Sequence, residues 1–349
     1  MTFFISTPFA SKTLPLTIIH SMMRAATAAV IVQLRRMTGT FVFRVFFYSL
    51  VIGLSFTMLY PLIKVLPAVF SDFSTLDDPN VVWVPLKFSI TSFAAAFRIG
   101  FGNNLGGMLW SLLYAAVIAA IQVASSTLAG YSLGRIEFPL RGFVMALVVV
   151  TIIMPPQALL IPQYMRFQKF DIFGIFTAIT GQPLNLLNKP YTLYLLSALG
   201  FGIKQGIFIF IFRQFFKGLP IELEEAAYMD GCGFYRTFFC ISLPNALPAL
   251  VTASSLAFVW NYGDTYYTGY FHADGPYIAS RLSTVFFSAD MPQMLNNISR
   301  WYSIPYATVY TFDAVKYAAG LLYIIPILLF FFIAQRRLVE NFEQSGIVG

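Results

Sequence analysis

Long apolar stretches separated by short polar segments make up most of this chain. A helix of about 20 predominantly apolar residues is long enough to cross a bilayer. The apolar stretches predict six transmembrane helices, at about residues 41–67, 108–133, 143–161, 191–216, 247–260 and 314–334. Pro155 and Pro156 interrupt the third stretch, because proline lacks the backbone N–H that a helix interior needs. The pattern therefore predicts an all-α membrane protein whose transmembrane domain covers residues 41–349.

Residues 1–40 predict a cytoplasmic or interfacial segment instead of a span. His20 and Arg24 interrupt its apolar part, which favours a helix lying at the membrane surface over one that crosses it. The same interruptions argue against a cleavable signal peptide, which needs an unbroken apolar core. Since methionines also stand at positions 22, 23 and 37, the true start of the protein is left open.

Composition and charge agree with a membrane protein. The 349 residues are 58% hydrophobic and 11% charged, whereas a soluble domain carries about 25% charged residues. The net charge of +7 does not indicate nucleic-acid binding, because the basic residues are scattered among the apolar stretches. Arginines adjoin the predicted spans and place one set of loops, together with both termini, in the cytoplasm; they stand at positions 35, 36, 44, 135, 141, 213, 336 and 337.

Chemistry of other classes of membrane protein is not visible in the sequence. Every Asp and Glu falls outside the predicted spans or at their ends, whereas an ion-coupled carrier holds carboxylates near mid-membrane. The chain has no phosphate-binding Gly-Lys-Ser/Thr loop, so it is not itself an ATPase. No metal site is expected, since His272 has no metal-ligating neighbour at a suitable spacing, and Cys232 and Cys240 are expected to be reduced thiols.

The polar stretch from 218 to 245 lies between the fourth and fifth apolar stretches and predicts two short helices joined by a turn. Glutamates at positions 222, 224 and 225 load the first helical turn with negative charge, which the helix dipole favours. Asp230 and Gly231 predict the end of this helix, with Gly231 in the left-handed conformation. Aromatic residues between 234 and 241 predict an amphipathic second helix.

This stretch resembles the EAA loop of ATP-binding-cassette importer permeases. The resemblance rests on Glu225-Ala226-Ala227, Gly231, Ile241 and Leu243-Pro244 at the spacing of that motif. It implies a type I importer permease fold in which the loop is a cytoplasmic coupling helix that docks on an ATPase subunit. The residues then expected to couple to the ATPase are Glu224, Glu225, Ala226, Ala227, Asp230, Gly231, Ile241, Leu243 and Pro244.

Weaker similarities point to the carbohydrate, or maltose-type, permeases. They include GYSLGRIEFPLRG before the third span and the C-terminal QRRLVENFEQSGIVG, which departs from the family pattern at Arg337-Leu338 and Asn341. The resemblance implies a carbohydrate permease that binds no cofactor of its own. Its expected partners are an ATPase dimer that uses ATP, a second homologous permease, an extracytoplasmic solute-binding protein and the lipid of a bacterial inner membrane. Glycerol phosphate or a polyamine remains an alternative solute, and a membrane-embedded transferase is the alternative of another class.

Three residues are candidates for the substrate pathway. Lys204 falls within the predicted fourth span, where it could donate a hydrogen bond to a polar solute. The competing interpretation, which we favour, is a helix break among Gly200, Gly202 and Gly206 that brings Lys204 to the outer interface. Trp260 and Asn261 begin an aromatic, polar segment at the end of the fifth span, which could stack on sugar rings, contact a solute-binding protein or belong to an interfacial aromatic belt.

Overall fold

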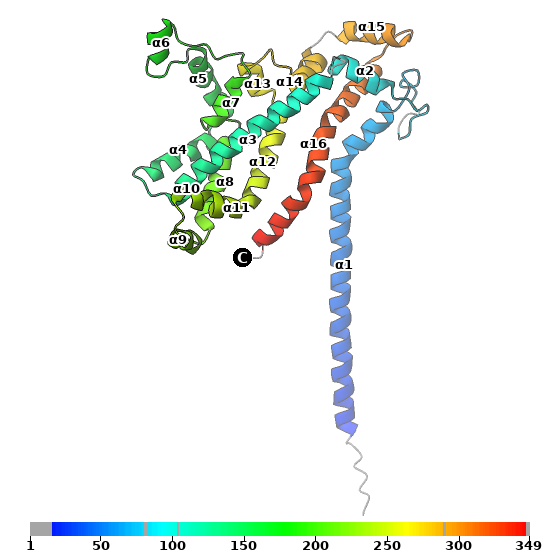
Figure 1. The fold of residues 1–349 in the computed structure, drawn as a ribbon. Helices are drawn as coiled ribbons and strands as arrows, with labels where there is room; N and C mark the ends of the chain where they lie inside the picture. The colour runs from blue at the N-terminus through cyan, green and yellow to red at the C-terminus, as the bar shows by residue number, and fades with distance from the viewer. Residues whose placement is uncertain (1–15, 80–82, 103–104, 289–290, 347–349) are drawn as a thin grey trace, which may run out of the picture. The chain divides into compact units, whose positions relative to one another are not determined.

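The computed structural model describes residues 16–79, 83–102, 105–288 and 291–346, and within these ranges the chain is helical (Figure 1). Two isolated bridges, Ser71 with Phe88 and Phe170 with Leu184, are its only β-type pairings in the described part, and no strand forms there. The chain divides into two compact units, residues 1–66 and residues 67–349. The all-α fold that the hydropathy pattern predicts is thus confirmed for the described residues.

The first unit consists mainly of α1 (Leu16–Val69), a single helix of 54 residues. Its apolar part, Phe41–Val69, is long enough to cross a membrane and agrees with the first predicted span. The helix passes residue 40 without interruption, so the boundary expected there is not an end of secondary structure. The interfacial location of the N-terminal segment remains a prediction.

The centre of the second unit is formed by α3 (Leu105–Arg135), α8 (Gln205–Gly218) and α12 (Leu247–Tyr262), with α3 packed against both other helices. Phe208, Phe212 and Phe216 recur on one face of α8 and are fully buried. Gly130 lets α3 approach this face, because a Cβ there would lie 2.4 Å from Cβ of Phe212. Large aromatic side chains on one helix therefore face a small residue on the other.

The remaining helices of the second unit fall at its two ends and along its sides (Figure 1). Near one end are α2 (Thr91–Gly100), α5 (Pro156–Gln168), α6 (Ile175–Thr180), α7 (Tyr191–Ala198), α13 (Tyr266–Phe271), α14 (Ile278–Ser283), η2 (Thr284–Ser288) and α15 (Met291–Tyr302). Near the other are α9 (Glu222–Met229), α10 (Phe234–Thr237), η1 (Phe238–Ser242) and α11 (Leu243–Asn245). Alongside the centre run α4 (Arg141–Ile153) and α16 (Val309–Gly346). Residues 261–313, expected as a long polar connection, thus contain several short helices.

The six predicted spans are not all confirmed. Among the described residues, Phe41–Val69, Gly106–Arg135 and Val309–Ile333 are helices long and apolar enough to cross a membrane. Two bent helix pairs raise the number to five, with bends of 109° between α4 and α5 and 74° between the α10–α11 segment and α12. The predicted fourth span is divided into α7 and α8 by residues 199–204. Its halves, of 8 and 14 residues, reach only about 12 and 21 Å, less than the bilayer core of about 30 Å.

Candidate functional site

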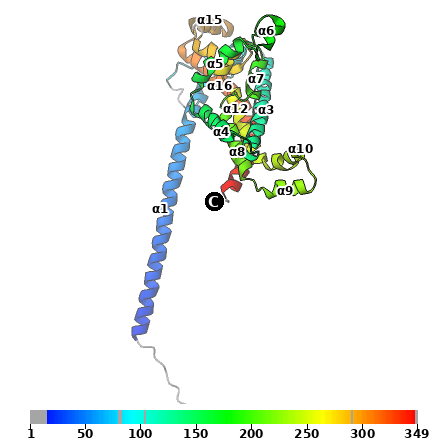
Figure 2. The same cartoon turned by 90° about the vertical axis from the view of Figure 1, so that its left-hand side faces the viewer.

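A helical hairpin projects from one end of the second unit (Figure 2). Its first arm is α9, which has Glu222, Glu224 and Glu225 in its first turn as expected. Its turn contains Gly231 with φ of +81°, so the predicted left-handed glycine is confirmed. The N–H of Cys232 donates to the carbonyl of Ala227, which closes the end of the helix in the manner of a glycine-terminated motif.

Glu224 faces into the hairpin and fixes it to the rest of the protein. Its Oε1 accepts a hydrogen bond of 2.8 Å from the hydroxyl of Ser242, in the second arm. The same oxygen lies 3.4 Å from Nε of Arg135, the last residue of α3, in a largely buried ion pair. Nη2 of Arg135 also donates to the carbonyl of Leu219, just before the hairpin. The end of α3 therefore holds both the start of α9 and the second arm.

The two alanines of the hairpin play different parts. Ala226 is exposed, whereas Ala227 is buried beneath the hairpin. Both are among the residues expected to couple to the ATPase, but the interior position of Ala227 means that its small size serves the packing of the hairpin itself. Glu225 and Asp230 are exposed and are available to a partner.

The second arm leads directly into α12. It consists of the four-residue α10, the π-helical η1 and the three-residue α11, and not of one regular amphipathic helix. Ile241 is half-buried in η1, Leu243 packs against the central core, and Pro244 is exposed in the first turn of α11. Only Ala246 separates α11 from α12, so the hairpin is connected to α12 by a single residue.

A second group of candidate residues surrounds the break between α7 and α8. Lys204 is in the left-handed conformation, with φ of +51°, immediately before α8, so the predicted break in the helix is confirmed. Its Nζ lies 4.5 Å from the centre of the Trp260 ring, a cation–π contact. Two of the three residues assigned to a substrate pathway therefore touch each other, although they are far apart in the sequence.

Asn261 joins the same region through Gln122 of α3. Its Nδ2 donates to Oε1 of Gln122 over 2.8 Å and to the carbonyl of Ala257 over 2.8 Å. Gln122 in turn donates from Nε2 to the carbonyl of Ile203, within the break, over 2.6 Å. The three predicted pathway residues thus lie around one polar network, whose central residue the sequence did not single out.

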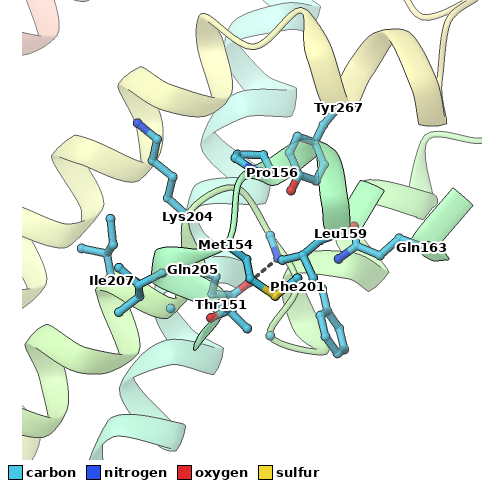
Figure 3. Close-up of a pocket in the computed structure, with 14 residues that line it drawn as sticks. Thr151, Met154, Pro156, Leu159, Gln163, Phe201, Lys204, Gln205, Ile207 and Tyr267 are labelled. Atoms are coloured by element: carbon cyan, nitrogen blue, oxygen red, sulfur yellow. Dashed lines mark hydrogen bonds between the residues drawn. The ribbon is translucent and has the colours of Figure 1, made fainter. Parts of the chain in front are cut away.

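A cavity of about 200 Å³ lies beside the break (Figure 3). One wall is the bend between α4 and α5, including Thr151, Met154 and Pro156, and the other contains the break residues Gly202 and Lys204. The side chain of Lys204 extends away from Thr151 and Met154 in this view. Trp260 and Asn261 are not among the residues that line the cavity.

Two ionisable groups, the half-buried Asp264 and the buried His272, follow α12. The carboxylate of Asp264 accepts hydrogen bonds from the backbone N–H groups of Tyr266, Tyr267 and Thr268 at the start of α13, and burial raises the pKa of Asp264. Nδ1 of His272 lies 2.5 Å from the hydroxyl of Tyr277, and burial lowers the pKa of this imidazole. These groups organise the short helices of the region 261–313.

Sequence reasoning missed Gln122, Gln205 and the structural role of Arg135. Gln122 is an uncharged polar residue within the second apolar stretch, and Gln205 follows the glycine-rich break, so a search for amides in apolar stretches would have found both. Arg135 was interpreted as a topology signal only. Its ion pair depends on a contact with a residue 89 positions later in the chain, which local sequence does not reveal.

Comparisons with known proteins agree with this architecture. The chain is 28% identical over 205 residues to the probable ABC transporter permease protein YurM of Bacillus subtilis, a match covering 58% of this chain and 61% of that protein, which is less than two thirds of its length. It is 24% identical over 304 residues to the arabinooligosaccharides transport system permease protein AraQ of Halalkalibacterium halodurans, covering 85% of this chain and 93% of that one.

A solved structure has the same fold. It is the crystal structure of a bacterial ABC transporter involved in the import of the acidic polysaccharide alginate, in which one chain matches with a TM-score of 0.60 at 16% identity, covering 95% of this chain and 99% of that chain. A family model, described as the binding-protein-dependent transport system inner membrane component, matches residues 126–344. That range holds the hairpin, the helix break and the cavity. The chain therefore belongs to the family of binding-protein-dependent transport system inner membrane components.

Proposed function

We propose that this chain is the transmembrane permease subunit of an ATP-driven importer, and that it translocates a carbohydrate delivered by an extracytoplasmic solute-binding protein. ATP is hydrolysed by a separate ATPase dimer, and a second homologous permease completes the pathway. In this proposal the chain is a transport subunit and not an enzyme, and it binds no cofactor of its own.

The observation that carries the proposal is the hairpin from α9 to α11. It offers a partner the exposed Glu225 and Ala226, together with the large side chains of Met229 and Tyr235, which are 88% and 77% exposed. Behind this surface, Glu224 and Ser242 hold the two arms together. A rigid, exposed hairpin that continues into a central helix has the properties required of an element that transmits ATPase movement.

The arrangement also supports the proposed orientation. In Figure 1 the described end of α16 lies toward the end of the second unit that carries α9, α10 and α11. If the hairpin contacts a cytoplasmic ATPase, the C-terminus is cytoplasmic, as the arginines near the spans predict. The region 261–313 then faces the solute-binding protein.

A carbohydrate is favoured over a polyamine by the similarity to AraQ, named for arabinooligosaccharides, and by the charge of the cavity. Within the described part of the chain, the residues that line the cavity include Lys204 and no Asp or Glu, whereas a polycation requires carboxylate partners. Amide and hydroxyl groups, such as those of Gln163 and Thr151, suit a neutral polyol.

The test is to purify the complex through an affinity tag on this chain and to reconstitute it in liposomes. We expect an ATPase to copurify and a panel of oligosaccharides, supplied with the solute-binding protein, to stimulate ATP hydrolysis and enter the vesicles. If only glycerol phosphate or only spermidine stimulated ATP hydrolysis, that compound would replace carbohydrate as the proposed class of solute. Absence of a copurified ATPase, with the chain folded and inserted, would contradict the transport function itself.

A further inference from the structure

We infer that Gln122 is a positioning residue, which transmits the movement of α12 to the break between α7 and α8 and thereby to the wall of the cavity. This inference rests on the proposed transport function and adds to it a specific mechanical link. The side-chain amide of Gln122 is the physical connection, because its nitrogen bonds to the break and its oxygen bonds to α12.

The first end of the amide holds the break. Nε2 of Gln122 donates to the carbonyl of Ile203 over 2.6 Å, and Ile203 lies between Gly202 and Lys204, two residues that line the cavity. The break cannot satisfy this carbonyl by helical bonding, since Lys204 is left-handed and α8 begins only at Gln205. The side chain of α3 therefore supplies what the broken helix lacks.

The second end of the amide holds α12. Oε1 of Gln122 accepts from Nδ2 of Asn261, in the last turn of α12. Gln122 is fully buried, so neither bond has water as a ready substitute. A displacement of α12 consequently either carries the amide and the break with it or leaves a buried polar group unpaired.

A parallel set of bonds, centred on Gln205, ties the break to α3 and to α7. Nε2 of Gln205 donates to Oγ of Ser125 over 2.7 Å and to the carbonyl of Ser197 over 2.8 Å, while its Oε1 accepts from the N–H of Gly202 over 2.7 Å. A Cβ at position 202 would lie 2.7 Å from Oε1 of Gln205 and 3.2 Å from Nε2 of Gln122. Glycine at this position is therefore what allows the two amides to meet the break.

The route begins at the hairpin, because α11 and α12 are separated by one residue. Movement imposed on the hairpin displaces α12, α12 displaces Asn261, and the Gln122 amide passes the displacement to Ile203. The cavity changes because Gly202 and Lys204, on either side of Ile203, form part of its wall. Gln122 itself is not among the residues lining the cavity, so its role is to position others.

The experiment measures label-to-label distances in the complete complex, in a background with Cys232→Ser and Cys240→Ser. Spin labels are placed at Leu113 on α3 as the reference, at Leu256 on α12, and at Phe201 in the break; these side chains are 58%, 37% and 49% exposed. The probe is MgATP with vanadate, so no solute has to be known. We expect the wild type to shift both the 113–256 and the 113–201 distances.

In Gln122→Leu we expect the 113–256 shift to persist and the 113–201 shift to fall by half or more. Gln122→Met tests the same link with nearly the same shape, since a thioether cannot donate to the Ile203 carbonyl, and it serves if the leucine variant does not assemble. Ser132→Ala is the control on α3, because the bond that its hydroxyl makes, to the carbonyl of Leu128, lies within that helix. Full retention of the 113–201 shift in an assembled Gln122 variant would overturn the inference. Absence of both shifts in the wild type would instead contradict the proposed transport function, and the inference with it.

Discussion

Nε of Arg135 lies 3.4 Å from Oε1 of Glu224, so an ion pair joins the last residue of α3 to the first turn of α9. Both side chains are largely buried, at 12% and 10% exposure, which limits screening by water and salt. The hairpin is therefore attached to the central helices by the backbone at both of its ends, through α8 and α12, and to α3 by this pair.

Arg135→Ala is expected to loosen the hairpin. Removing one partner of a buried ion pair leaves the other charge uncompensated, at a cost of about 3 kcal/mol. Faster proteolysis within residues 222–245 would show that the hairpin has loosened. Glu225→Gln changes an exposed neighbouring residue and is the control that should leave the rate of proteolysis unchanged. Adding Glu224→Gln to Arg135→Ala should restore part of the protection, because it removes the unpaired charge; additive losses would contradict the pairing.

Gly231→Val is expected to impair coupling more than any other change in the turn. With φ at +81°, a β-branched residue is strained by about 1–2 kcal/mol and redirects the second arm. Gly233→Ala is the matched control, since Gly233 has an ordinary φ of −75° and open space around its Cβ position. Solute-stimulated ATP hydrolysis is the measurement, and equal rates for the two variants would show that the left-handed turn is dispensable.

Ala226→Trp and Ala227→Trp are expected to fail for different reasons. A tryptophan at the exposed position 226 blocks a partner while leaving the permease abundant and stable. At position 227, which is 5% exposed, the same side chain overpacks the hairpin and lowers its stability by about 1–3 kcal/mol. Copurification of the ATPase measures the first effect and thermal unfolding of the permease measures the second. Identical thermal stability of the two variants would contradict the assignment of Ala227 to the interior.

Glu225→Ala is expected to weaken ATPase binding only modestly. Glu225 is exposed on α9, and a solvent-accessible interfacial ion pair contributes about 1 kcal/mol or less. The weakening should diminish as salt concentration rises, because screening already removes most of the attraction. A salt-independent loss of ATPase binding would indicate a buried contact instead.

The stability of the region around His272 is expected to depend on pH. Burial lowers the pKa of this imidazole below its ordinary value near 6.5, so the neutral form is favoured in the folded protein. Its contribution to stability is then complete above about pH 6.5 and is lost as the pH falls below that value. The unfolding temperature, measured from pH 7.5 down to pH 5, should therefore fall more steeply in the wild type than in His272→Gln. Parallel declines would exclude His272 as the cause.

Local sequence predicted those features that local chemistry determines. The three acids followed by Gly231 sufficed for a capped helix and its left-handed turn, and glycines 200, 202 and 206 sufficed for the break before α8. Apolar length alone misjudged residues 191–216, because hydropathy does not register a reversal of backbone dihedral angles at Lys204. The bend at Pro155 was visible as an interruption of the third apolar stretch. The bend at Ala246 was not, because the hydropathy pattern showed only a short fifth span that begins after it.

The contacts within the candidate site were beyond local reasoning. Lys204 and Trp260 were assigned to one pathway, yet nothing in the sequence indicated that their side chains meet. Ala226 and Ala227 are chemically identical neighbours, and only the direction in which α9 faces the second arm separates an exposed position from a buried one. Such distinctions depend on tertiary packing, to which composition and spacing are insensitive.

The bond between Gln122 and Ile203 joins residues 81 positions apart, with the donor made first during synthesis. A nascent segment covering residues 191–218 enters the membrane as an apolar stretch, and exposed backbone carbonyls in lipid are strongly disfavoured. The break is therefore tolerated only beside α3, whose Gln122 amide satisfies the Ile203 carbonyl. Because α3 precedes this segment in the chain, the side chain that satisfies the Ile203 carbonyl is already synthesised when residues 191–218 emerge from the ribosome.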